Sequence, residues 1–371
     1  MRVRLCLFVA GLLIPFLSIR AQQPAQKKPL DIYFLDTEGG QATLFVAPSG
    51  QSMLVDTGFP GNQGALPGEA NAPGITRDAD RIMAVLKQAN VAVLDYVVIT
   101  HYHGDHVGSA AELANRIPIR HFVDHGDYTV ELQPNRSAGF TSYQAVRAKA
   151  HAIVPKPGDK IPVTGLDVEV VSAAGEVITK PVVGAPGAGA PNALCRDAKL
   201  KDQDPTPENT ESLGLVVRYG KFRLLDLGDL VWNLEHALVC PNNLLGTFDV
   251  FHTTRHGDPH SGVPQLVHAI RARVAIMNNG EKKGGDPEYW QIVHTAPGLE
   301  DFWQEHRSAA GGEDHNSPEQ FIANLSETDH LHNIKMSVLP DGSFTVTNER
   351  TGFIKEYAAK NAAAPARQGR K

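Results

Sequence analysis

The sequence has no excess of positive charge, which bears on the ligands that the protein can bind. It contains 35 lysine and arginine residues against 41 aspartate and glutamate residues, and its net charge is -6. A general nucleic-acid-binding surface needs clustered positive charge to neutralise phosphates. We therefore expect no strong nucleic-acid-binding surface, and long DNA is not the obvious substrate.

Long hydrophobic runs are also missing. The apolar stretch Leu5–Leu17 has thirteen residues, whereas a membrane-spanning helix needs about 20. This stretch follows Arg2 and Arg4, and Ile19-Arg20-Ala21 offers a passable cleavage site before Gln22, a pattern typical of a signal peptide. We predict that residues 1–21 are removed and that the protein is exported, periplasmic or secreted, without a transmembrane span. An uncleaved anchor is the alternative.

Cysteine is scarce, with three residues in the chain. Cys6 lies in the predicted signal peptide, so Cys195 and Cys240 remain after cleavage. An exported protein meets an oxidising compartment, in which paired cysteines form disulfides. Our hypothesis is that Cys195 and Cys240 are bonded to each other; two unpaired thiols are the alternative.

What is present suits one large domain. The 371 residues are 42% hydrophobic, which is enough to build a core. After a polar linker at 22–29, we expect one folded domain over 30–357 with a Gly/Pro-rich insertion at 181–208. Residues 358–371 form a basic tail that we expect to be disordered.

The stretch Leu94–Gly108 carries the strongest functional signal. Its apolar residues at 96–99 are typical of a buried strand. Imidazole and carboxylate side chains follow within six positions, namely His101, His103, Asp105 and His106. These are the ligands of zinc and similar divalent ions. The stretch predicts a metal site at the end of a strand; a histidine-rich polar loop without metal is the alternative.

The spacing of these ligands indicates two ions. His101 and His103 can point the same way and clasp one ion, while Asp105 and His106 can point to a second. Two ions about 3.5–4 Å apart can share a water and hold it as hydroxide near neutral pH. On the chemistry of these donors we expect two zinc ions, although iron accepts the same ligands.

The HxHxDH pattern after an apolar strand resembles the metallo-β-lactamase superfamily. The resemblance implies an α/β fold, the four-layer αββα sandwich, that binds one or two metal ions at one edge. The chain also resembles, over roughly residues 30–280, the hydrolase domain of ComEC-type competence proteins and their free-standing relatives.

The resemblance implies further ligands. His125 follows a short strand at 121–123 and would be the third ligand of the first ion; a surface histidine in a turn is the alternative. Asp229 ends the segment NTESLGLVVRYGKFRLLDLGD and would bridge both ions; a helix N-cap is the alternative. His256 would be the terminal ligand of the second ion, with His252 and His260 as rival ligands or proton donors.

Several positions depart from the ComEC-type pattern. The family's HHGS motif appears here with Arg255 and Asp258 at its ends, and Gln41 replaces the aspartate of a VGQGDA-like segment. Arg255 suits an anionic substrate group, since guanidinium matches carboxylate and phosphate; a surface salt bridge is the alternative. Asp56, in a DTG turn, suits a role in ordering the loop or a ligand rather than binding metal itself.

These residues together predict a metal-dependent hydrolase. His101, His103 and His125 would hold one ion, Asp105, His106 and His256 the other, with Asp229 between them. Asp105 would also orient the attacking hydroxide. A phosphodiester or other ester is the expected substrate. The alternatives are a β-lactamase or lactonase, a non-catalytic metal-binding module, and a di-iron redox site.

The C-terminal part is less family-like. We predict helices at 299–307 and 318–325, followed by a hairpin of strands at 334–338 and 344–347. Three large aromatic residues, Tyr289, Trp290 and Trp303, either wall the cleft or pack in the core, and core packing is the more common outcome.

Overall fold

The computed structural model describes residues 28–61, 77–127, 139–196, 198–201, 207–326 and 331–360. The predicted signal peptide, most of the linker at 22–29 and the end of the tail after residue 360 lie outside the described residues. Among the residues described, no helix is long and apolar enough to cross a membrane.

The first half of the chain and the C-terminal hairpin build one mixed sheet of nine strands in the described residues. Its strands β3, β4, β5 and β6 are parallel to one another, and the remaining pairs are antiparallel. The strands in spatial order are β18 (Ile354–Tyr357), β17 (Phe344–Asn348), β16 (Ile334–Val338), β1 (Leu30–Phe34), β2 (Thr43–Val46), β3 (Ser52–Val55), β4 (Leu94–Val98), β5 (Ile119–Val123) and β6 (His151–Ile153).

The second half builds another sheet, in which β11 to β15 are parallel and the strands before them are antiparallel. The strands in order are β15 (Ile322–Asn324), β14 (Asp301–His306), β13 (Val274–Met277), β12 (Val250–His252), β11 (Phe222–Asp226), β10 (Gly214–Tyr219), β8 (Asp167–Ala173) and β7 (Lys160–Ile161), with β9 (Glu176–Val177) paired to β8.

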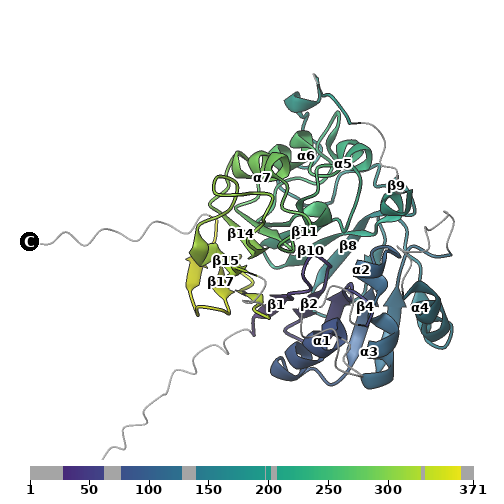
Figure 1. Ribbon diagram of the computed structural model, residues 1–371. Helices are drawn as coiled ribbons and strands as arrows, with labels where there is room; N and C mark the ends of the chain where they lie inside the picture. The colour runs from purple at the N-terminus through teal and green to yellow at the C-terminus, as the bar shows by residue number, and fades with distance from the viewer. Residues whose placement is uncertain are drawn as a thin grey trace, which may run out of the picture.

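Helices cover the outer face of each sheet (Figure 1). Those against the first sheet are α1 (Arg77–Gln88), α3 (Ala110–Arg116) and α4 (Phe140–Arg147). Those against the second are α5 (Trp232–Val239), α6 (Pro264–Ile270) and α7 (Pro287–His294). The predicted αββα sandwich is confirmed.

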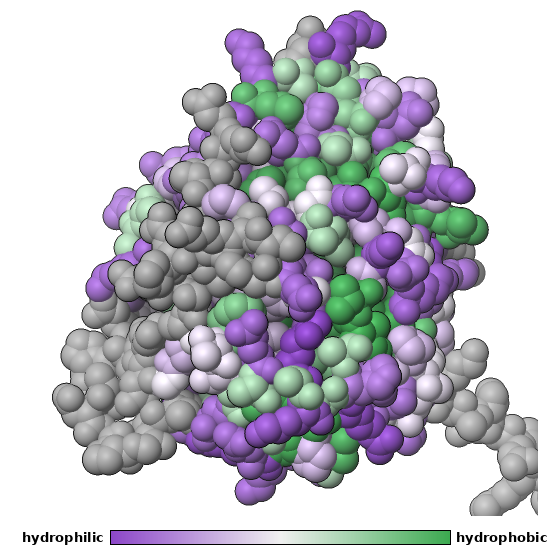
Figure 2. Space-filling view, turned by 90° about the vertical axis from the view of Figure 1, so that its right-hand side faces the viewer, coloured by the Kyte–Doolittle hydropathy of each residue, from purple (hydrophilic) through white to green (hydrophobic). Residues whose placement is uncertain are grey.

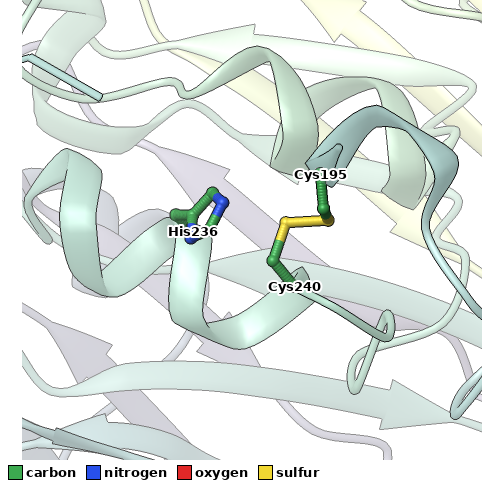
Figure 3. Close-up of side chains that lie close together, drawn as sticks. All are labelled: Cys195, His236 and Cys240. Carbon is green, nitrogen blue, oxygen red and sulfur yellow. A yellow bond between two sulfur atoms is a disulfide. The ribbon is translucent and has the colours of Figure 1, made fainter. Parts of the chain in front are cut away.

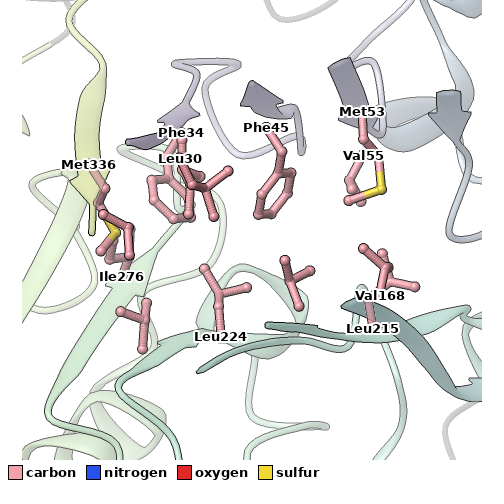
Figure 4. Packing of buried hydrophobic residues seen from close by; sticks show 14 of the residues in the cluster. Leu30, Phe34, Phe45, Met53, Val55, Val168, Leu215, Leu224, Ile276 and Met336 are labelled. Atoms are coloured by element: carbon pink, nitrogen blue, oxygen red, sulfur yellow. The ribbon is translucent and has the colours of Figure 1, made fainter. Parts of the chain in front are cut away.

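The main core lies between the two sheets (Figure 4). Strand β1 shows how the sequence builds it, because side chains alternate between the faces of a strand. Ile32 and Phe34 point into the core between the sheets, and Tyr33 packs in the cluster under the helices. Both faces are buried, which explains why such strands read as continuous apolar runs.

Two predicted helices in the C-terminal part are wrong. Residues 301–306 form strand β14, which pairs in parallel with β13, and residues 318–325 form the short 3₁₀ helix η4 (Glu319–Phe321) followed by strand β15. Phe302 and Trp303 pack on opposite faces of the sheet. Pairing with a distant strand therefore overrides the local helical propensity.

Other C-terminal predictions hold. Strands β16 and β17 form the predicted hairpin. The side chains of Tyr289, Trp290 and Trp303 are buried in the core.

On the face of the molecule shown in Figure 2, hydrophobic residues lie among hydrophilic ones.

The structure joins Cys195 and Cys240 by a disulfide, as hypothesised. Cys195 ends the 3₁₀ helix η1 (Ala193–Cys195) of the insertion, and Cys240 follows α5 (Figure 3). His236 of α5 lies beside the bond. The disulfide therefore ties the Gly/Pro-rich insertion to the helix that begins three residues after Asp229.

Candidate metal centre

All the predicted ligands except His125 gather where parallel strands of both sheets end. His101 and His103 follow β4, Asp229 follows β11, and His256 follows β12. Asp105 and His106 lie on α2 (Gly104–Val107), a single helical turn where the sequence predicted a loop. Carboxyl ends of parallel strands share one edge of a sheet, so the two sheets bring these side chains to a common site.

One group consists of His101, His103 and Asp229, whose ligand atoms all lie within 4.8 Å of one another. His101 Nε2 is 2.8 Å from His103 Nδ1 and 4.0 Å from Asp229 Oδ2. Burial lowers the pKa of His101 well below its usual value and also lowers the pKa of His103. Both imidazoles are thus biased toward the neutral form, which is the form that binds metal.

A second group consists of Asp105, His106, Asp229 and His256. His106 Nε2 and His256 Nε2 are 3.2 Å apart, and each lies 3.3–3.4 Å from Asp229 Oδ1. Asp105 Oδ2 is 3.3 Å from His256 Nε2. Two imidazole nitrogens and two carboxylates therefore converge on one point.

The chemistry of these donors fits two divalent cations. Asp229 belongs to both groups, so its carboxylate would be a ligand to both ions. Its Oδ1 is buried and accepts no hydrogen bond from the residues described. A buried charged oxygen without a partner is costly unless a cation compensates it. The all-nitrogen-and-oxygen donor set suits zinc and related ions.

The charges at the second group also favour a bound cation. Burial disfavours a proton on His106, yet Asp229, Asp105 and Asp56 outweigh burial and raise its pKa well above the usual value. Despite burial, His106 and His256 hold the pKa of Asp229 well below its usual range. The ionised carboxylates concentrate negative charge that a divalent ion would balance.

Asp56 holds the ring of His106 from the side that faces away from the second group, and the sequence indicated such an ordering role. Its carboxylate accepts hydrogen bonds from the backbone N–H and the hydroxyl of Thr100, each at 2.7 Å, and its Oδ2 is 2.7 Å from His106 Nδ1. The second ring nitrogen of His106 therefore points into the site. Asp56 has a φ of 60°, a left-handed conformation that Asp and Asn tolerate better than other residues.

The structure does not bring His125 into either group. Its Nε2 lies 3.0 Å from Glu208 Oε1, and its ring packs on that of Tyr102. The prediction of His125 as a third ligand came from the family resemblance, which implies a ligand after this strand. Instead, Glu208 comes from the segment before β10 and occupies the space next to it.

Glu208 lies beside the first ligand group, and the sequence analysis missed it. Its Oε1 also accepts a hydrogen bond of 2.8 Å from the backbone N–H of Tyr102, which lies between His101 and His103. Its Oε2 is buried and has no hydrogen-bond partner among the described residues. The signal was a carboxylate just before the hairpin that carries Asp229, which we had assigned to the insertion.

The rivals of His256 stand outside both groups. His252 is buried, with Nδ1 2.9 Å from Asp226 Oδ2. His260 Nδ1 pairs with Asp258 Oδ1 at 2.8 Å at the surface. The alternative of Asp229 as a helix N-cap is also excluded, because the N-cap of α5 is Val231.

His256 sits in a strained turn. Arg255 and His256 have φ values of 52° and 56°, and Gly257 follows with 80°. Left-handed backbone costs about 1 kcal/mol or more per non-glycine residue, so neighbours must hold it. The His256 carbonyl accepts a hydrogen bond of 2.9 Å from the backbone N–H of Gly285, and the Gly257 carbonyl accepts one of 3.0 Å from Asp286.

A cavity of about 330 Å³ opens onto both groups. Its lining residues are Phe59, His103, Gly104, Asp105, Asn209, Asp229, Arg255, His256, Asp258, Lys283 and Gly284. Lys283 was not foreseen from the sequence, because it lies 178 positions from Asp105, the residue it contacts. The site is therefore accessible to a small molecule.

Comparison with known families agrees with this geometry. Residues 36–192 match the family described as the metallo-beta-lactamase superfamily. This segment of the chain is therefore similar to metallo-β-lactamase superfamily proteins. The match includes the HxHxDH stretch and His125 but ends before Asp229 and His256, so it does not cover these two candidate ligands. No curated protein matches the sequence.

Solved structures similar to this chain share little sequence with it. The metallo-beta-lactamase fold protein YhfI from Bacillus subtilis is 11% identical, with a TM-score of 0.44, covering 75% of this chain and 96% of that one. Igni18, a metallo hydrolase from Ignicoccus hospitalis, is 14% identical, with a TM-score of 0.39 and coverages of 72% and 93%. CmlA, a diiron β-hydroxylase from Streptomyces venezuelae, is 14% identical, with a TM-score of 0.35 and coverages of 74% and 48%.

Proposed function

We propose that the protein is an exported metal-dependent hydrolase that holds two divalent ions, with zinc the best match to its donors. The observation that carries this proposal is the shared carboxylate of Asp229, which belongs to both ligand groups. His101 and His103 would hold the first ion. Asp105, His106 and His256 would hold the second.

Bound ions of this kind polarise a carbonyl or phosphoryl oxygen and make water a nucleophile near neutral pH. The protein's own groups prepare the site for that chemistry. The Asp56 carboxylate keeps Nε2 of His106 directed inward. Asp105 lines the cavity with a side chain that is 15% exposed, so its carboxylate can accept a hydrogen bond from the attacking water and orient it.

For the substrate we propose a phosphodiester or another ester, in line with the ComEC-type resemblance. The cavity admits a small molecule or the end of a chain. Hydrolysis of a β-lactam or lactone is the runner-up, since export would make it useful. A metal-binding module without turnover, and a di-iron redox site with the same ligands, are the remaining alternatives.

The test is elemental analysis of the purified mature protein together with hydrolysis of bis(p-nitrophenyl) phosphate and nitrocefin. Two zinc ions with phosphodiester turnover support the proposal, and nitrocefin turnover moves the protein to the β-lactamase side. Visible absorbance would reveal iron. We expect His103→Ala to lose metal and activity together; full activity without bound metal contradicts the proposal.

A further inference from the structure

Lys283 is a positively charged side chain in the cavity, and it has no role in the proposed binding of metal. Its Nζ donates a hydrogen bond of 2.5 Å to the Gly39 carbonyl and contacts Asp105 Oδ2. It also lies 5.3 Å from the centre of the Phe59 ring. A lysine ammonium has three donors, and the residues described use two of them. The side chain is 41% exposed, so the third donor is available to a molecule in the cavity.

Close backbone packing around Lys283 fixes the position of the loop that carries it. A Cβ on Gly39 would lie 2.9 Å from Lys283 Cβ, and a Cβ on Gly284 would lie 2.0 Å from the His256 carbonyl oxygen. Both glycines are left-handed, with φ values of 87° and 71°. Only glycine permits these close approaches. The loop that carries Lys283 is thereby pressed against the loop that carries His256.

Arg255 is the second basic side chain of the cavity. It directly precedes His256, and its backbone N–H donates a hydrogen bond of 2.9 Å to the Gly228 carbonyl next to Asp229. Its side chain is 13% exposed and its Nε is 3.6 Å from Asp258 Oδ1. Arg255 is therefore anchored between the segments that supply Asp229 and His256.

The charge of the lining changes sign when ions are bound. Three carboxylates line the cavity, from Asp105, Asp229 and Asp258, and two cationic side chains oppose them. One divalent ion makes the sum positive, and a second raises it further. A cationic concave site favours ligands of the opposite charge. The loaded cavity thus selects an anion.

We propose that Lys283, assisted by Arg255, binds an anionic group of the substrate, a carboxylate or a phosphate, next to the bond that is cleaved. This inference rests on the proposed hydrolytic function and names its substrate class. Lys283 supplies a point charge with a free donor, and the guanidinium of Arg255 suits a planar or tetrahedral oxyanion.

The experiment compares three p-nitrophenyl esters whose acyl chains end in a methyl group, a carboxylate or a phosphonate. The full metal-loaded protein is assayed as wild type, Lys283→Met, Lys283→Arg and Lys282→Met. Lys282 is exposed and does not line the cavity, so its variant is the matched control. Metal content is measured in every sample.

We expect the wild type to prefer one of the anionic esters, and which one it prefers identifies the group. The ratio of kcat/KM for that ester over the neutral ester should fall about 10-fold in Lys283→Met, the size of one charge-assisted contact. Lys283→Arg should retain most of the ratio, and Lys282→Met all of it. An unchanged ratio in Lys283→Met, or its loss of metal, would overturn the inference.

Failure of the proposed function is distinguishable from failure of this inference. If no ester is turned over, calorimetry with acetate and methylphosphonate still measures anion binding to the metal-loaded protein. About 10-fold weaker binding to Lys283→Met than to Lys282→Met supports the anion site without hydrolysis. Equal binding to the two variants rejects it.

Discussion

Asp56 Oδ2 lies 2.7 Å from Nδ1 of His106, and both side chains are completely buried. This contact joins two segments that are 50 positions apart and leaves the other ring nitrogen of His106 directed into the candidate metal centre. A carboxylate that accepts the outer N–H of a ligand histidine orients the ring and raises its basicity.

We therefore predict that Asp56→Asn weakens binding of the second ion by about 10- to 100-fold. Asparagine tolerates the left-handed backbone at this position, so the loss of charge is tested without a new backbone strain. Chelator competition measures the affinity. Asp159→Asn, at an exposed turn, is the control. Equal affinities in both variants would show that Asp56 does not order the ligand.

Glu208 leads to a prediction about the first ion. Its buried carboxylate holds the peptide between His101 and His103, and one of its oxygens has no partner among the described residues. We expect Glu208→Gln to weaken binding of one equivalent of metal by about 10-fold, because the amide carries no charge.

The matched variant is Glu211→Gln, in the same 3₁₀ helix η2 (Pro207–Glu211). Metal titrations of the two variants are compared with wild type. If Glu208→Gln binds both equivalents as tightly as Glu211→Gln, Glu208 has only a structural role.

The close packing at Gly284 predicts a specific loss of stability. Gly284→Ala places a Cβ 2.0 Å from the His256 carbonyl, whereas Gly352→Ala, at nearly the same φ of 70°, meets nothing within 4 Å. Both variants bear the left-handed strain of about 1 kcal/mol. Overpacking should cost Gly284→Ala about 1–3 kcal/mol more. Urea unfolding measures the difference, and equal free energies of unfolding would contradict the packing argument.

Glu235 predicts how stability depends on pH. Burial raises the pKa of this carboxyl to about 7, although the Val263 N–H donates a hydrogen bond to it. Since the usual value is 4.5, the folded state binds more protons than the unfolded state between about pH 4.5 and 7. The free energy of unfolding should therefore fall as pH rises through this window, by about 3 kcal/mol in total.

Glu235→Gln removes this titration and should flatten that part of the profile. Urea unfolding at pH 5 and pH 8 compares the variant with wild type. The variant should be the more stable protein at pH 8. A variant with the same decrease between the two pH values as wild type would show that another group is responsible.

Much of the fold was readable from local patterns. The apolar residues at 96–99 predicted strand β4, and the hairpin at 334–347 followed from alternating side chains around a turn. These predictions succeed because the side chains of a strand alternate between its two faces, so neighbouring residues in the sequence show the pattern. The segment at 299–307 failed for the opposite reason, since its strand exists only through pairing with β13.

The sequence by itself determined the centre of the site. His101, His103, Asp105 and His106 lie within six positions after a buried strand, so covalent connectivity alone keeps them together. The sequence also identified Asp229 and His256, through a family resemblance, as residues to be joined to them. The structure places the ligand atoms of both within 4.8 Å of their groups.

Only the tertiary structure decided the surroundings of that centre. It turned His125 toward Glu208, and it brought Lys283 to Asp105 across 178 positions. Such contacts depend on the order in which strands pair and on close approaches at glycines such as Gly39 and Gly284. The pattern of residues along the sequence predicts neither the order of strand pairing nor these close approaches, because neither follows from the spacing of neighbouring residues.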